Sequence, residues 1–130
     1  KAHEECYRHQ CFETTKLVAE ALNIPLEKCL STFQSRLGID PWLKPYTADT
    51  LEKLPENGIT KLAVLTPSFV SDCLETIEEM DMENREIFEE AGGVVYDFIP
   101  CLNDSDPWID ALEKWVKDWC VNKLPTQHIA

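Results

Sequence analysis

The strongest constraint on the fold of this chain is a pair of short apolar runs separated by one long amphipathic segment. The runs are KLAVLTP at residues 61–67 and VVYDFIP at residues 94–100, and each has the length and apolar character of a buried strand. Between them, residues 71–93 place apolar side chains at helical spacing and end in Gly92 and Gly93. A helix between two strands is typical of a parallel crossover, so we expect both strands to lie in one sheet.

Further segments continue this alternation of helices and strands. Apolar spacing and chain-breaking residues predict three more helices and one more strand. The helices fall at about 13–22, 47–54 and 107–120, and the strand falls at 29–36. We therefore predict a single α/β domain over residues 1–130, with an open parallel sheet of about three to four strands flanked by helices.

The chain is strongly acidic, with a formal net charge of −12 over 130 residues. A protein that binds nucleic acid needs a basic face, so we expect no nucleic acid among its partners. The acidity fits a cationic partner, a metal ion or simple solubility. No apolar run reaches the roughly 18 residues that span a bilayer, and the polar start KAHEECYRHQ does not read as a signal peptide. Six cysteines without a CxxC pair fit a cytoplasmic protein with free thiols, which is the localisation we expect.

Three tryptophans, Trp108, Trp115 and Trp119, recur at helical spacing on the last predicted helix. We expect them to pack as a stripe against the rest of the chain. An exposed stripe would instead indicate a protein partner or a membrane surface. The net negative charge limits the second case to a weak association with a membrane surface.

The helix predicted at 71–93 gathers acids on one side. At about 100° per residue, six of them share an arc of about 80°. These are Asp72, Glu75, Glu79, Glu83, Glu86 and Glu90. One interpretation is a ladder of carboxylates that passes a hydrated cation or protons along the helix. The other is an outer face screened by water, which spacing alone favours, although Arg85 is the only cation in the segment and cannot pair with all the acids.

A second candidate region is the loop GIDPWLKPYT at 38–47, which its glycine and prolines exclude from regular structure. Trp42 on this stiff loop could present its face to a flat aromatic ligand, or it could cap the core. Gln34 and Ser35 end the strand before it, and they could donate to a ligand carboxylate or satisfy backbone groups. Ligands of open parallel sheets bind beyond the carboxyl ends of the strands, so this loop and the start of the acidic helix could face one cleft.

Several motifs resemble one enzyme family. FQSRLGIDPWLKPYT at 33–47 and LTPSFVSDCLETIEEMDMENREIFEEAGG at 65–93 resemble ferrochelatase, which inserts ferrous iron into protoporphyrin IX. IPCLND at 99–104 and CYRHQCFETT at 6–15 resemble further segments of the family, in its bacterial style. The resemblance implies a fold of two similar α/β halves that face each other across a porphyrin cleft. This chain resembles the C-terminal, chelatase-like half.

The resemblance implies that this chain is part of a lyase that performs the last step of haem biosynthesis, with Fe2+ and protoporphyrin IX as substrates. Glu75 matches the principal acid of the family, with a role in proton removal or metal delivery. Glu79 and Glu83 match further acids on the same helix, which resemble a path for iron or protons. Gln34, Ser35 and Trp42 match residues near the porphyrin.

The sequence also departs from the family pattern, because the histidine motif of the preceding half is absent. His3, His9 and His128 do not lie in such a motif. We therefore expect this chain alone to be inactive and to need the N-terminal half of the enzyme as its partner. Some members carry a [2Fe-2S] cluster, for which Cys6 and Cys11 are candidate ligands if further cysteines lie upstream.

Two other functions are consistent with the same residues. One is a half-size chelatase that acts on another tetrapyrrole and completes its cleft as a homodimer. The other is a non-catalytic module that binds a porphyrin or a metal. Solution mass, a metallation assay and a porphyrin titration followed through Trp fluorescence separate these cases.

Overall fold

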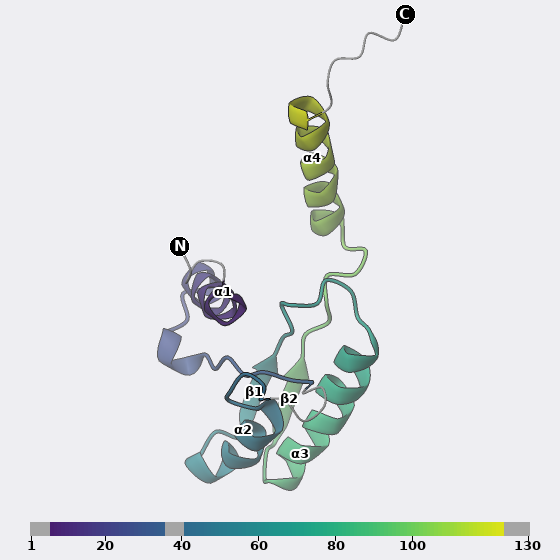
Figure 1. Ribbon diagram of the computed structural model, residues 1–130. Coiled ribbons are helices and arrows are strands. Elements are labelled where there is room, and N and C mark those ends of the chain that lie inside the picture. The colour runs from purple at the N-terminus through teal and green to yellow at the C-terminus, as the bar shows by residue number, and fades with distance from the viewer. Residues whose placement is uncertain (1–5, 36–40, 124–130) are drawn as a thin grey trace, which may run out of the picture.

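A computed structural model describes residues 6–35 and 41–123 of the chain, and its centre is a pair of parallel strands. Strand β1, Lys61–Val64, pairs with β2, Val95–Phe98, in the register that sets Lys61 opposite Val95. Figure 1 shows the two strands side by side, with helices α2 and α3 beside them. The parallel crossover expected from the apolar runs is confirmed, and so is the α/β class.

The core lies between this sheet and its two neighbouring helices, α2, Thr47–Lys53, and α3, Asn84–Glu90. Leu51, Leu54, Phe88 and Tyr96 form the buried cluster. The rings of Phe88 and Tyr96 lie 6.0 Å apart, and Phe88 is 0% exposed. The Tyr96 hydroxyl donates to the Met80 carbonyl oxygen at 2.6 Å, so the only polar atom of this buried side chain is satisfied.

The sheet has two strands in the described residues, so the expected count of three to four is not confirmed. Phe33, inside the strand predicted at 29–36, forms only an isolated parallel bridge with Tyr46. Three local features prevent a longer ladder. Ser35 has a φ of 59°, which leaves the extended conformation, and α2 begins at Thr47, directly after the bridge. Pro45 also has no N–H to give to a ladder.

The long acidic helix differs from the prediction in its winding. Residues Glu75–Glu83 form a π-helix, and only Asn84–Glu90 continue as the α-helix α3. The 100° step used to place six acids in one arc therefore does not apply to the first half of the segment. Ser71 and Asp72 precede the helix, and the Cys73 carbonyl oxygen accepts the first helical bonds, from the amides of Thr76 and Ile77. The helix therefore starts later than the sequence suggests.

Two long helices frame this centre. Helix α1, Tyr7–Leu22, begins about two turns before the predicted start and ends at Asn23, whose φ of 54° is left-handed. It is followed by a short 3-10 helix, Leu26–Lys28, and a second one, Pro55–Asn57, follows α2. Helix α4, Asp106–Lys123, ends the described chain.

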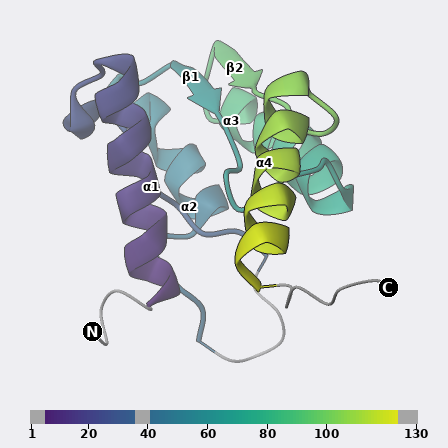
Figure 2. The same ribbon diagram turned by 90° about the horizontal axis from the view of Figure 1, so that it is seen from above.

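Helix α4 projects away from the strands, as Figure 1 shows, and Figure 2 shows it separated from α1. It packs closely on no other element of the described chain. Trp115 and Trp119 are 58% and 56% exposed, so the expected packing of the tryptophan stripe against the rest of the chain is wrong for these two residues. Trp108 is half-buried and stacks edge-on with Trp115, at 5.5 Å between ring centroids.

No helix in the described part of the chain is long and apolar enough to cross a bilayer. Several predictions fall on residues outside the described ranges. These are His3, His128, the last residue of the strand predicted at 29–36, and Gly38 in the tryptophan loop.

Candidate functional site

The Glu79 carboxylate, on the π-helix, is the centre of the candidate site. Its Oε2 accepts hydrogen bonds from Gln34 Nε2 at 3.0 Å and from the Ser35 hydroxyl at 2.7 Å. Both donors are uncharged, so they orient the carboxylate without neutralising it. The π-helix presents Glu79 to the end of the 29–35 segment, and Ser35 reaches it from a left-handed backbone conformation.

Trp42 joins the same group through the backbone. Its indole N–H donates to the Gln34 carbonyl oxygen at 3.0 Å, while the ring remains 39% exposed. Gln34 is thus bonded to Trp42 through its main chain and to Glu79 through its side chain. Four of the residues predicted for the site, Gln34, Ser35, Trp42 and Glu79, are brought together by these contacts, although they come from two segments about 40 residues apart.

Glu75 lies at the start of the π-helix and is exposed. A hydrogen bond from the Cys73 thiol, helped by the backbone amide of Glu75, lowers the pKa of this carboxyl. Glu75 is therefore an anion at neutral pH, and it lies about one helical turn before Glu79. The Cys73 thiol is the main cause of this lowered pKa.

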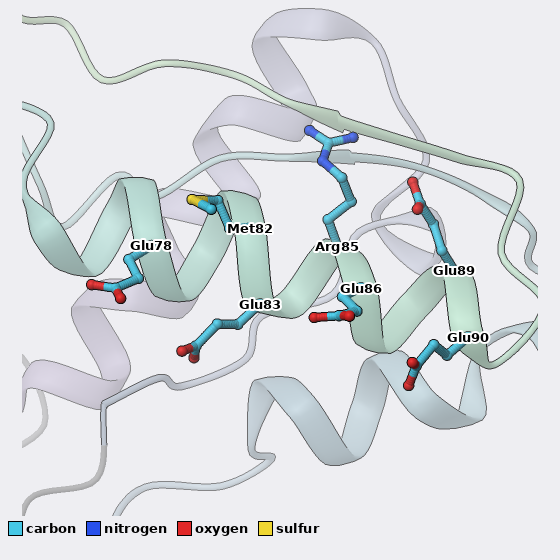
Figure 3. Close-up of a pocket in the computed structure, with 7 residues that line it drawn as sticks. All are labelled: Glu78, Met82, Glu83, Arg85, Glu86, Glu89 and Glu90. Carbon is cyan, nitrogen blue, oxygen red and sulfur yellow. The ribbon is translucent and has the colours of Figure 1, made fainter.

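Glu83 lies at the other end of the π-helix, on an open groove of about 590 Å3. The groove is lined by Glu78, Met82, Glu83, Arg85, Glu86, Glu89 and Glu90. Figure 3 shows Glu83 on the same side of the helix as Glu78, while Arg85 points to the opposite side, toward β2. Arg85 bonds the Asp81 carboxylate and the Tyr96 carbonyl oxygen, so its charge is directed away from Glu78 and Glu83 and lies on the side of Glu89.

A contact that sequence reasoning missed, between Asp72 and Asn103, ties the start of the helix to the loop after β2. The Asp72 carboxylate accepts from Asn103 Nδ2 at 2.7 Å, and the Asp72 amide donates to Asn103 Oδ1 at 2.8 Å. The Asn103 hydrogen bond is the main reason that the pKa of Asp72 is lowered, and burial opposes it. Both residues lie in quoted motifs, SDCLET and IPCLND, but no sequence signal showed that they pair.

The carboxyl ends of the two strands carry an apolar surface. Leu65, Phe69, Val70, Leu74 and Ile77 are all exposed there, on the loop after β1 and on the first turns of the following helix. The Tyr7 hydroxyl at the start of α1 lies 3.1 Å from the Ser68 hydroxyl in the same loop. Apolar side chains beside a few oriented polar groups are the composition of a small-molecule site.

The thiols and acids of the described residues form no group of three or more arranged to hold a metal ion. Glu75, Glu79 and Glu83 therefore follow one another along the helix and do not converge on one ion. Cys6 is exposed and Cys11 is half-buried, and these two make half of the usual four ligands of a cluster. The [2Fe-2S] cluster expected on them is not supported.

Comparison with known sequences gives a consistent result. A family model described as Ferrochelatase matches residues 1–119. The ferrochelatase of Vibrio cholerae is 46% identical over 116 residues, which are 89% of this chain and 36% of that protein. Those of Nitrobacter hamburgensis and Allorhizobium ampelinum are 49% and 50% identical over 110 and 111 residues, in each case 85% of this chain and 32% of the relative. The chain thus spans about a third of the length of the curated relatives it matches.

Proposed function

We propose, because this chain belongs to the ferrochelatase family, that it forms the C-terminal, carboxylate-bearing part of an enzyme that inserts Fe2+ into protoporphyrin IX, the last step of haem biosynthesis. The observation that carries the proposal is the Glu79 carboxylate, held by Gln34 and Ser35 beside Trp42. This arrangement orients an anion next to an exposed indole, as a site for a metal cation and a flat aromatic ring requires.

The acids have distinct parts in this proposal. Insertion of Fe2+ releases the two pyrrole protons of the porphyrin, so the site needs both a cation ligand and a proton acceptor. Glu75 has a lowered pKa and therefore suits cation binding better than proton storage. We assign Glu75 to the delivery of Fe2+ to the porphyrin or to the acceptance of the pyrrole protons that the porphyrin releases. Glu79 lies next to it on the same helix.

Glu83 extends the series to the open groove at the far end of the π-helix. Fe2+ exchanges its water for oxygen ligands stepwise, so acids in sequence can pass it without a fixed chelating site. The groove is strongly negative, because its acids outnumber Arg85, and such a surface raises the local concentration of cations. In the proposal it is the entrance for hydrated iron.

The porphyrin itself needs an apolar slot. Trp42 on one side and the exposed Leu74 and Ile77 at the helix start are candidates for one wall of that slot. The rest of the enzyme would supply the other wall, together with the histidine motif that this sequence lacks. The exposed tryptophans of α4 fit the same proposal, since they offer an apolar face that the described chain leaves uncovered.

The test is metallation by the full-length protein, with Fe2+ and protoporphyrin IX as substrates. Glu79→Gln keeps the shape of the side chain and removes its charge, so we expect the rate to fall about tenfold or more. Glu52→Gln is the matched control, because Glu52 is an exposed acid on α2, outside both the series and the groove, and its rate should stay near that of the wild type. Porphyrin binding without metallation by the wild type would favour the non-catalytic module, and full activity of a half-size dimer would favour the homodimeric chelatase.

A further inference from the structure

Asn84 is a buried polar residue to which the proposed function gives no role. It is the first residue of α3, at the junction with the π-helix, and it is 2% exposed. Its side-chain Nδ2 donates to the Glu79 carbonyl oxygen at 2.7 Å. The same nitrogen lies 3.3 Å from Gln34 Oε1 and 3.5 Å from the Met80 sulfur. A buried amide placed among these groups is well positioned to fix their orientation.

The first effect of Asn84 is on the winding of the helix. The Glu79 carbonyl oxygen also accepts the backbone N–H of Asn84, which is the bond from residue i to residue i−5 of a π-helix. In an α-helix this oxygen would accept from Glu83. Asn84 therefore supplies two donors to one carbonyl oxygen, and both stabilise the π winding that presents Glu79.

The second effect is on Gln34. An amide side chain has a donor end and an acceptor end, and nothing in its shape decides which end points where. The Asn84 donor faces Gln34 Oε1, so Gln34 Nε2 must face the other way, toward the Glu79 carboxylate. Asn84, Gln34 and Glu79 thus close a ring of hydrogen bonds that begins and ends on Glu79.

We propose that Asn84 is a positioning residue that holds the Glu79 carboxylate in place, through the Glu79 backbone and through the orientation of the Gln34 amide. The proposal rests on the proposed function insofar as Glu79 acts in metallation. Asn84→Asp has the same shape but replaces the donor with an acceptor. It sets a carboxylate against the Glu79 carbonyl oxygen and Gln34 Oε1, and it favours a reversed Gln34 amide that turns its oxygen toward Glu79.

The kinetic test uses the full-length protein with Fe2+ and protoporphyrin IX, with Asn84→Asp made in the wild type and in Glu79→Gln. We expect kcat to fall about tenfold in the wild type and to change less than about twofold in Glu79→Gln, because Asn84 acts through Glu79. Asn57→Asp is the matched control, since the exposed Asn57 makes a similar side-chain bond to the Lys53 carbonyl oxygen at 2.8 Å. Equal losses in both backgrounds would assign Asn84 to the stability of the fold and overturn the proposal.

A structural readout separates this proposal from the proposed function. We expect Asn84→Ala, which adds no charge, to speed hydrogen exchange across the π-helix and at Gln34 and Ser35, while Asn57→Ala leaves exchange there unchanged. Unchanged exchange in Asn84→Ala overturns the positioning role, whatever the rates. A wild-type rate in Glu79→Gln would remove Glu79 from metallation, and faster exchange in Asn84→Ala would still support the positioning of its carboxylate.

Discussion

The crossover unit, made of α2, β1, α3 and β2, and the last helix, α4, are both built from amphipathic sequence, yet only the first buries its apolar face. In the crossover unit, Leu51, Phe88 and Tyr96 meet in one core. In α4, Trp115 and Trp119 remain more than half exposed. Periodicity shows that a helix has an apolar face, but what covers that face depends on tertiary contacts. In our proposal the remainder of the enzyme covers α4.

The polar side of α4 is stabilised within the helix itself. Lys114 bonds Asp118 at 2.7 Å, and Lys117 pairs with Glu113, both at the i, i+4 spacing. Such exposed pairs contribute about 0.3–0.5 kcal/mol each, too little to hold a helix alone. The stability of α4 in the complete protein should therefore depend on contacts of its tryptophans.

The largest expected effect comes from replacing one large aromatic side chain by alanine in each of the two regions. Phe88→Ala empties the core of the crossover unit, so we expect a loss of about 3–5 kcal/mol in the free energy of unfolding of this chain. Trp119→Ala should cost less than about 0.5 kcal/mol in the same chain. Urea denaturation measures both values. In the full-length protein, Trp119→Ala should lower the free energy of unfolding by about 2 kcal/mol or more, because the remainder of the enzyme covers the indole there. A loss as small as in this chain alone would mean that nothing covers α4.

An intermediate effect is expected from the buried tyrosine at alkaline pH. Burial raises the pKa of Tyr96 to about 12, above the value of about 10 in an unfolded chain. Between these values the unfolded chain loses the proton and the folded chain keeps it, so stability should fall as pH rises from about 10 to 12. Tyr96→Phe should remove this part of the fall, at a cost of about 1 kcal/mol at neutral pH for the lost bond to Met80. The urea midpoints of the wild type and of Tyr96→Phe are measured from pH 8 to 12. The same fall with pH in both proteins would contradict the burial argument.

The smallest effect concerns the contact between Asp72, just before the π-helix, and Asn103, in the loop that joins β2 to α4. The pKa of Asp72 is lowered from 3.8, chiefly by Asn103, so its contribution to stability is present above that pH and is lost as pH falls below it. Asn103→Gly removes the donor and tolerates the φ of 50° at this position. We expect it to be less stable than the wild type at neutral pH, with a difference that narrows below about pH 4. A difference that stays constant down to pH 2, measured by urea denaturation, would show that the hydrogen bond does not lower the pKa.

The sequence predicted the parallel crossover and four residues of the candidate site, which the structure brings together, because those features leave local signals. Two apolar runs of strand length flank a segment whose apolar residues have helical spacing. The site residues Gln34, Ser35, Trp42 and Glu79 lie in specific motifs. Gln34, Ser35 and Trp42 lie in one motif and Glu79 lies in another. The contacts that join them, from Gln34 and Ser35 to Glu79, cross about 45 residues and could only be seen in the structure.

Other features leave no such signal. The π winding depends on a single extra residue per turn and on the side chain of Asn84, while the apolar spacing of the segment still fits an α-helix. In the part of the chain that the structure describes, Phe33 forms only a bridge because of Pro45 and the left-handed Ser35, whose effects on strand pairing depend on the neighbouring segment. The exposure of the α4 tryptophans could not be predicted, since the spacing of a buried stripe and of an interface stripe is the same.

The most direct test of the central claim is metallation by the full-length Glu75→Gln protein. Glu75 is exposed at the start of the π-helix with a lowered pKa, and we propose that it makes the principal contact with iron or with the pyrrole protons of the porphyrin. We predict that porphyrin binding and the circular dichroism spectrum stay as in the wild type, while the rate of Fe2+ insertion falls at least about 100-fold. A folded Glu75→Gln protein that inserts Fe2+ at the wild-type rate would contradict the account.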